Sequence, residues 1–442
     1  MRHPIVHLVL LLALAGCATT GTNARQPLTE AQRAGNLESF QLAWETVRDR
    51  HWDANLGGFD WDAVYDEIKP KVEAAKTQKE YTAAVQGMIS RFEQSHFSIV
   101  PSEVYEEMSG GGGEDAEGSP GFDLRVVDGR ALVTRVEPES SAAKQGIQTG
   151  WILTHVQGKS LRPMLAEIRQ TFEGKTMLEL IQGEAVLGKL SGSVGETLGL
   201  RFRDGGDRKT DVDVALVKPR GTKHQLGVFP PNFVYIEHRV LPANIGYVTF
   251  NMFMDPVNVM KGFEEAMRSF RDCRGIVIDI RGNPGGMPAM AMGMAGFLVD
   301  RKDLAFGTMK MRDSDLNFVV NPRPRPYTGP VAMLIDGTSA SASEIFAGGL
   351  RDMKRARLFG ARTAGAVLPA QFMELPNGDF FYYPIADYIS MNGDRLEGVG
   401  VAPDTEARPD RAALLEGRDT ALNAAIAWIV GEHKATASPN GD

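Results

Sequence analysis

A cluster of small residues and serines that follows an apolar stretch is the part of this sequence best suited to chemistry. Val331–Ile335 is a continuous apolar run of the kind found in buried strands. Three serines, Ser339, Ser341 and Ser343, come next, before a helical pattern begins. A hydroxyl at a helix start lies near free backbone N–H groups and the positive end of the helix dipole. This setting favours attack on a carbonyl carbon, although the serines could also merely cap the helix.

A second apolar run enters a glycine-rich turn earlier in the chain. Gly275–Ile280 has the composition of a buried strand, and Gly285 and Gly286 follow it in the stretch DIRGNPGG. Adjacent glycines let the backbone approach a substrate closely and point its amides toward it. The alternative is a purely structural turn. Taken with the serine turn, this segment predicts backbone donors beside a nucleophilic hydroxyl.

The two segments resemble signatures of the C-terminal processing (tail-specific) serine peptidases. The matching stretches are DIRGNPGG, TSASASEIFAGGLRD, RFEQSHFSIVP and EGVGVAPD, and the resemblance covers roughly residues 36–430. It implies a crotonase/ClpP-like α/β core with Ser341 as nucleophile and the amides of Ala342 and of Gly286 or Gly285 as oxyanion-hole donors. It also implies hydrolysis of peptide bonds through an acyl-enzyme, in unfolded or C-terminal segments of exported proteins. No cofactor is expected.

The general base departs from the pattern of many of these relatives. They carry a lysine in a T-x-G-K-G turn after the nucleophile helix, and this sequence has Ala366 at that place. Lys354 belongs to the helix that follows the serine and is too far along it to substitute. A Ser-Lys dyad is therefore not expected here.

The tricorn core proteases, a second branch of the superfamily, use serine, histidine and glutamate. Their pattern matches Ser95-His96 and the EGVGVAPD stretch that begins at Glu397. The resemblance implies that His96 is the base and Glu397 its orienter, with Ser95 as an auxiliary polar group. A histidine of ordinary pKa, about 6.5, predicts that activity is lost below that pH. The alternatives are a histidine bonded to backbone at a helix end and a solvated glutamate, with Asp394 as a rival.

Residues 118–218 resemble a PDZ domain. Arg130–Val136 alternates as a strand does, residues 139–146 form a short capped helix ended by glycine, and residues 198–216 read as two strands around the turn Asp204–Asp207. The resemblance assigns the peptide groove to the loop that departs from the usual Gly-Leu-Gly-Phe pattern, namely Gly121, Phe122, Asp123 and Leu124.

The rest of the chain divides by composition. Spacings of three and four between apolar residues predict a helical N-terminal domain, and alternating strands and helices predict an α/β peptidase domain. The expected boundaries are a signal peptide at 1–17, a tether at 18–35, the helical domain at 36–105, the peptidase domain at 219–430 and a tail at 431–442.

The first residues have the pattern of an export signal. A charged start precedes the short apolar run Leu8–Ala15, which is too short to span a bilayer. The stretch LAGC resembles a bacterial lipobox, which implies that Cys17 is lipidated. Ala18 follows, and this favours the outer membrane, with the protein facing the periplasm. The alternative is a plain signal peptide with a chance cysteine.

Composition excludes several kinds of function. The net charge is −8 and no basic stripe is present, so nucleic acid is not an expected partner. Cys273 alone remains after Cys17, which leaves no pair for an internal disulfide. The histidines show no metal-ligand spacing, so no metal is expected. Two other functions stay open: a non-catalytic PDZ-containing peptide-binding protein that has lost its base, and a small-ester hydrolase.

Overall fold

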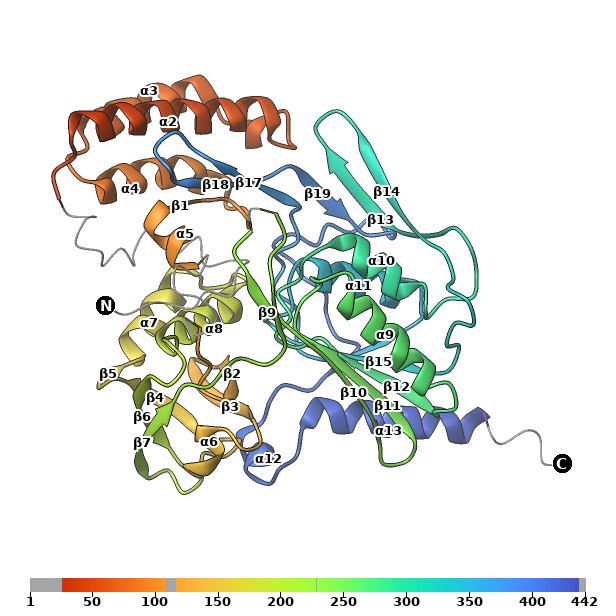
Figure 1. The fold of residues 1–442 in the computed structure, drawn as a ribbon. Helices are drawn as coiled ribbons and strands as arrows, with labels where there is room; N and C mark the ends of the chain where they lie inside the picture. Colours follow the sequence, from red (N-terminus) through yellow and green to blue (C-terminus); the bar gives the residue numbers. More distant parts are fainter. Residues whose placement is uncertain (1–25, 109–116, 228, 437–442) are drawn as a thin grey trace.

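The computed structural model describes residues 26–108, 117–227 and 229–436, in which a helical N-terminal region and a middle unit (residues 118–218) adjoin a larger α/β core (Figure 1). The predicted leader, including Cys17, lies outside the described residues, as does the glycine run at residues 110–113. In the described ranges, no helix combines the length and the apolar character needed to cross a bilayer.

The core is built on a six-stranded sheet. Its order is β10-β11-β12-β15-β16-β20, with β10 antiparallel to β11 and every other pair parallel. The strands are β10 (Ile236–Leu241), β11 (Ile245–Phe250), β12 (Gly275–Asp279), β15 (Val331–Ile335), β16 (Arg357–Gly360) and β20 (Thr405–Glu406). The strands predicted at 245–250 and 331–335 are confirmed, and the one predicted at 275–280 ends one residue earlier.

Helices cover both faces of this sheet, which explains why its central strands are apolar throughout. Successive side chains of a strand point to opposite faces. Ile276 and Ile278 therefore pack in the cluster of one face, whereas Val277 packs with side chains of the helix on the other. The covering helices are α9 (Asn258–Ser269), α10 (Pro288–Ala295) and α11 (Ala342–Asp352) on one face and α13 (Thr420–Thr436) on the other. The last helix continues beyond the domain end predicted at residue 430.

The middle unit has an antiparallel sheet and an apolar cluster of its own. The sheet order is β2-β3-β4-β6-β7, so β2 is an edge strand, and α8 packs beside it. The elements are β2 (Phe122–Val127), β3 (Arg130–Val136), α6 (Ser141–Lys144), β4 (Ile152–Val156), β5 (Lys159–Ser160), α7 (Arg162–Thr171), α8 (Leu178–Lys189), β6 (Thr197–Arg203) and β7 (Lys209–Ala215). The strand predicted at 130–136 and the hairpin around Asp204–Asp207 are confirmed. The PDZ-like assignment stays a prediction.

The N-terminal helices begin earlier than the sequence pattern predicted. The tether expected to reach residue 35 is wrong at its end, because α2 starts at Glu30. Thr29 and Gln32 form a reciprocal capping box that fixes this start: the Thr29 N–H donates to Gln32 Oε1 (3.0 Å) and the Gln32 N–H donates to Thr29 Oγ1 (3.3 Å). The helices of this region are α2 (Glu30–Arg50), α3 (Trp61–Ala74), α4 (Gln78–Ile89) and α5 (Ser102–Met108).

A short strand ties the N-terminal region to the core. β1 (Ser98–Val100) pairs with β18 (Phe380–Pro384), which also pairs with β17 (Ala370–Glu374). Phe97 and Phe381 share one apolar cluster with the helices. The segment just before β1 is therefore held against the core by a strand from the far end of the sequence. The remaining elements are η3 (Leu56–Gly58), η4 (Ser90–Phe92), β8 (Thr222–His224), β9 (Asn232–Val234), β13 (Leu304–Met311), β14 (Asp315–Val320), β19 (Ala386–Ile389) and α12 (Arg411–Leu415).

Candidate active site

Ser341 lies at the turn between β15 and α11. Its backbone has φ 54° and ψ −120°, a strained conformation for a residue other than glycine. The helix starts at Ala342, so the first N–H groups of α11 have no partner inside the helix and carry partial positive charge. A strained strand-to-helix turn of this kind presents a serine hydroxyl away from the backbone, as nucleophilic serines of hydrolases require.

The three serines of this turn differ in what their hydroxyls do. Ser339 Oγ donates to the Ile280 carbonyl (2.9 Å), and Ser343 Oγ donates to the Asn283 carbonyl (2.8 Å). Both side chains are fully buried, whereas Ser341 is half-buried. The hydroxyl protons of the two competitors are therefore committed to structural bonds between the serine turn and the glycine turn.

The glycine turn lies directly against the serine turn. A Cβ built on Gly285 would stand 2.6 Å from Ser341 Cβ and 2.8 Å from the Ala342 nitrogen, so only glycine fits there. The Gly285 N–H donates to the side-chain oxygen of Asn283 (2.9 Å). Of the two glycine amides considered from the sequence, that of Gly285 is thus already engaged.

Gly286 is held in a short parallel bridge to Phe253. The Phe253 N–H donates to the Gly285 carbonyl (2.7 Å), and the Met287 N–H donates to the Phe253 carbonyl (2.8 Å). In such a bridge the groups of the middle residue point to the opposite side. The Gly286 N–H is therefore turned away from Phe253, and with Ala342 it remains a candidate oxyanion donor.

Ser95, His96 and Glu397 form one hydrogen-bonded chain. Ser95 Oγ lies 2.7 Å from His96 Nδ1 and donates to Glu397 Oε2 (2.9 Å). Glu397 also accepts the backbone N–H groups of Ser95 (2.7 Å) and Val367 (2.9 Å). Three donors converge on Glu397, which suits a carboxylate. The glutamate thus reaches the histidine through the serine hydroxyl and not directly.

This chain assigns the protons of the imidazole. With Glu397 ionised, the single Ser95 hydroxyl proton goes to this carboxylate, and Nδ1 of His96 then donates to Ser95 Oγ. Nε2 then carries the free lone pair, as a general base requires. It is buried and makes no hydrogen bond with any described residue, the Ser341 hydroxyl included.

Burial shifts both ionisable groups toward their neutral forms. Burial lowers the pKa of His96 to about 3. Burial also raises the pKa of Glu397, while the donors from Ser95 and Val367 oppose that rise. The histidine is therefore neutral through the whole weakly acidic range, which differs from the ordinary pKa assumed from the sequence.

One peptide unit links the two halves of the site. The Ala366 carbonyl accepts the Ser341 N–H (2.8 Å), and the next N–H, of Val367, donates to Glu397. Ala366, at the place where the family resemblance led us to look for a lysine, is fully buried. The backbone at this position thus connects the serine turn to the carboxylate that orients His96.

Glu344 is a polar residue of this site that the sequence analysis missed. Its Oε1 accepts from Thr363 Oγ1 (2.5 Å) and the Gly365 N–H (2.8 Å), and its Oε2 accepts from the N–H groups of Ser341 (3.0 Å) and Ala366 (2.9 Å). Burial raises its pKa to about 7, against the pull of these four donors. Its place as the third helical residue after a serine was the signal for a capping role.

Two family models match the chain. The model described as Peptidase family S41 matches residues 244–407, which contain both turns. The model described as Tricorn protease C1 domain matches residues 33–90. A probable CtpA-like serine protease of Staphylococcus haemolyticus (strain JCSC1435) is 26% identical over 334 residues, which are 73% of this chain and 59% of the relative. The chain is therefore similar to peptidase family S41, over the residues that contain both turns.

Other matches agree with this similarity to S41 serine peptidases. A putative tricorn protease homolog 2 of Streptomyces coelicolor (strain ATCC BAA-471 / A3(2) / M145) is 26% identical over 431 residues, 93% of this chain and 34% of the relative. The chain thus spans 59% and 34% of the lengths of these two relatives. The solved structure of a photosystem II D1 C-terminal processing protease has a TM-score of 0.57 at 20% identity, covering 88% of this chain and 95% of that one. The mixed α/β fold, with its helical N-terminal region and several sheets, is shared.

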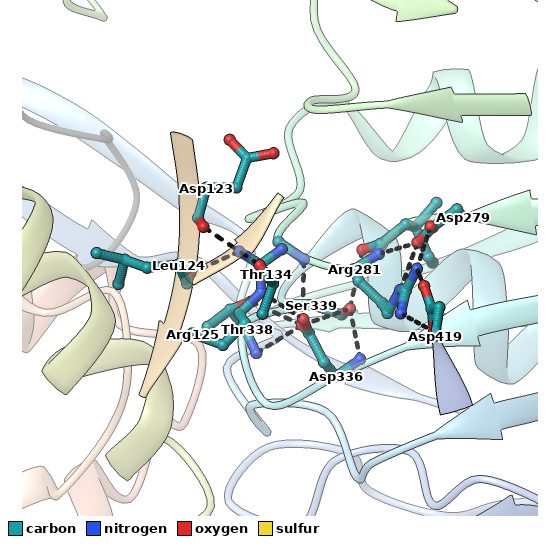
Figure 2. Close-up of polar contacts among 12 residues, drawn as sticks. Asp123, Leu124, Arg125, Thr134, Asp279, Arg281, Asp336, Thr338, Ser339 and Asp419 are labelled. Atoms are coloured by element: carbon teal, nitrogen blue, oxygen red, sulfur yellow. Dashed lines mark hydrogen bonds and ion pairs between the residues drawn. The ribbon is translucent and has the colours of Figure 1, made fainter. Parts of the chain in front are cut away.

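An arginine of the middle unit anchors both turns of the candidate site. Figure 2 shows Arg125 of β2 against Asp336, which lies just after β15; the Nε to Oδ2 distance is 2.6 Å. Asp336 also accepts the N–H groups of Gly282 (3.1 Å) and Thr338 (3.0 Å). Burial alone would raise the pKa of Asp336, but Arg125 and these donors hold it below its ordinary value. Sequence patterns gave no sign of this contact between distant segments.

Other candidates from the sequence lie away from the site. Contrary to the expectation from the sequence, Lys354 is not part of the helix after the serine but lies two residues beyond the end of α11, whose 11 residues span about 16 Å at 1.5 Å per residue. Asp394, the rival of Glu397, is exposed in a turn closed by bonds with Ser390. In the predicted groove, Phe122, Asp123 and Leu124 line a cavity of about 970 Å³ between the middle unit and the core. Gly121 packs against Ser140.

Proposed function

We propose that this S41 peptidase hydrolyses peptide bonds in unfolded or C-terminal segments of exported proteins. Ser341 is the nucleophile, His96 the general base, and Glu397 orients His96 through Ser95. The observation that carries the proposal is the Ser95 bridge, because it fixes the Nδ1–H tautomer and leaves Nε2 of a buried imidazole without a partner.

The proposed reaction has two steps. Ser341 Oγ bonds to the substrate carbonyl carbon while its proton passes to His96 Nε2, and the N–H groups of Gly286 and Ala342 stabilise the oxyanion. Collapse of the resulting tetrahedral intermediate breaks the C–N bond, and His96 returns the proton to the departing amine. Water then attacks the acyl-enzyme by the same route and frees Ser341. The bond between Ser341 and His96 is not formed in this structure, and we propose that it forms with substrate bound.

The nucleophile is tested by Ser341→Ala. Cleavage of an unstructured fluorogenic peptide should be abolished while the melting temperature stays near that of the unmodified protein. The cleavage rate of His96→Gln should fall nearly as far, because members of a triad act as a unit. Wild-type rates in either folded variant would contradict the proposed roles.

The alternative function is a non-catalytic peptide-binding protein that has lost its base. Two observations favour it: Ala366 replaces the lysine of many relatives, and His96 makes no bond to Ser341. A fluorophosphonate probe separates the two functions, since it labels only activated serines. Labelling that disappears in Ser341→Ala supports the peptidase, and a folded protein that is never labelled supports the binder.

We also propose that the protein is lipid-anchored at Cys17 in a bacterial cell envelope, facing the periplasm from the outer membrane. The support is the sequence alone: a charged start, an apolar run and the stretch LAGC followed by Ala18. Radiolabelled palmitate should enter the wild-type protein and not Cys17→Ala. Equal labelling of both proteins would refute the anchor.

A further inference from the structure

The cavity between the middle unit and the core has the size and position of a peptide site. Its volume of about 970 Å³ lies at the upper end of the range for ligand sites. β2 and α8 form one wall, and Gly282 and Pro284 of the glycine turn and Thr338 of the serine turn lie on the other. A ligand held there is therefore next to both turns that flank Ser341.

One wall of the cavity contains the edge strand of the middle sheet. Among the described strands, β2 pairs with β3 alone, and its Leu124 carbonyl already accepts from Arg125 (2.8 Å). An extended peptide can add to such an edge through main-chain hydrogen bonds, while alternate side chains enter neighbouring pockets. Because α8 packs beside β2, side chains of the added strand would point toward α8.

The charged side chains of the lining are mostly acidic. Five are arginines, Arg125, Arg135, Arg220, Arg239 and Arg281, and nine are carboxylates. Seven of the carboxylates are in ion pairs, namely Glu117, Asp123, Glu137, Glu237, Asp279, Asp336 and Asp419. The other two are Glu106, which is exposed, and Glu184. This excess of negative charge favours a cationic ligand over an anionic one.

Glu184 on α8 is buried without a cation of its own. It is 8% exposed, and its Oε2 makes no hydrogen bond with any described residue. Arg125 attracts Glu184 electrostatically, but its guanidinium donates its hydrogen bonds to Asp336 (2.6 Å) and to the Leu124 carbonyl (2.8 Å). Burial raises the pKa of Glu184 to about 8, with Arg125 opposing the rise. A cation placed beside Glu184 would offset the cost of burying this carboxylate.

We propose that the cavity binds an extended peptide segment carrying a lysine or arginine, whose cationic head pairs with Glu184. This inference rests on the proposed function, and it names the class of segment delivered to Ser341: basic and not acidic. The pair would give the site its selectivity, since main-chain bonds to β2 are the same for any sequence.

The test uses the full-length Ser341→Ala protein, so that binding is measured without cleavage. Two fluorescent peptides of one extended sequence, differing by lysine or norleucine at a single position, are titrated by fluorescence polarisation. A hydrogen bond to a charged group is worth about 1.5–3 kcal/mol, so the lysine peptide should bind about 10- to 150-fold more tightly. Scanning the lysine along the peptide locates the position facing Glu184.

The Glu184→Gln change in the same background should abolish this preference, so that the lysine and norleucine peptides bind with about equal affinity. Glu106→Gln, at the exposed acidic residue of the same lining, is the control and should leave the preference intact. A lysine preference below threefold at every position, or one that survives Glu184→Gln, overturns the inference. If Ser341→Ala binds the lysine peptide selectively but the wild-type protein cleaves no peptide, the proposed function is refuted and this inference is not. Cleavage with no lysine preference would refute only this inference.

Discussion

The Ser95 hydroxyl gives the sharpest test of the proposed mechanism. The change Ser95→Ala removes the hydroxyl that joins His96 to Glu397. It leaves Glu397 with two backbone donors, from Ser95 itself (2.7 Å) and from Val367 (2.9 Å), so the carboxylate should stay in place. Ser95 is buried, with 3% of its surface exposed.

The expected loss follows from the bond that is removed. When His96 takes the proton of Ser341, its Nδ1–H bond to Ser95 becomes a bond from a charged donor. Such bonds are worth about 1.5–3 kcal/mol, and each 1.36 kcal/mol is a factor of ten in rate. We therefore expect kcat to fall about 10- to 150-fold. KM should stay within about twofold, because the bond strengthens only in the transition state.

The assay is steady-state hydrolysis of an unstructured fluorogenic peptide at pH 7.5, with the melting temperature measured on the same samples. Ser98→Ala is the matched control: Ser98 is a buried serine on β1 whose Oγ makes no hydrogen bond with the described residues. It should keep wild-type kcat. A folded Ser95→Ala protein with kcat within threefold of wild type would show that Glu397 does not act on His96 through this hydroxyl.

Three further predictions concern stability and pH. Replacing Arg125 with Gln leaves the buried Asp336 unpaired and should lower the free energy of unfolding, measured with urea, by about 3 kcal/mol. A double-mutant cycle with Asp336→Asn should give a coupling energy of about 1–3 kcal/mol, and additive effects of the two changes would contradict the proposed anchor. Glu344→Gln at pH 8 should cost about 1–3 kcal/mol, because either amide orientation leaves the N–H of Gly365 or Ala366 without an acceptor; a change below 0.5 kcal/mol would refute this. The pKa of His96 is about 3 in the folded protein and about 6.5 in the unfolded chain, so the unfolded chain binds the proton first as the pH falls. The free energy of unfolding that His96 contributes is therefore present above pH 6.5 and is lost as the pH falls toward 3. Unfolding of His96→Gln should therefore depend less on pH in that window, and kcat/KM of the wild type should show no histidine limb near pH 6.5.

Much of the core was predictable because its signals are local. The runs at 245–250 and 331–335 are strands covered on both faces, and such strands are apolar at every position. The serine turn follows the second of these runs and the glycine turn follows β12, so Ser341 and the glycines could be picked out by residue type and order. The helix start at Glu30 was missed even though its capping box, Thr29 with Gln32, is also local.

The arrangement around His96 was less predictable. Ser95, His96 and Glu397 could be nominated as a set, but nothing local showed that Ser95 stands between the other two. That order depends on β1 pairing with β18, which fixes the segment before it against the core. The low pKa of His96 has the same origin, because burial is decided by segments that lie far away in the chain.

The sequence by itself determined which residues can react: a serine at a strand-to-helix turn, glycines that allow close backbone approach, and a histidine and a glutamate of suitable chemistry. Only the tertiary structure decided which hydroxyl is left uncommitted, which imidazole nitrogen is bare, and that Glu344 and Arg125 hold the two turns. These outcomes depend on hydrogen bonds and ion pairs between residues tens to hundreds of positions apart. Residue type and spacing describe only neighbours along the chain, so they cannot encode those pairings in a form that a single sequence reveals.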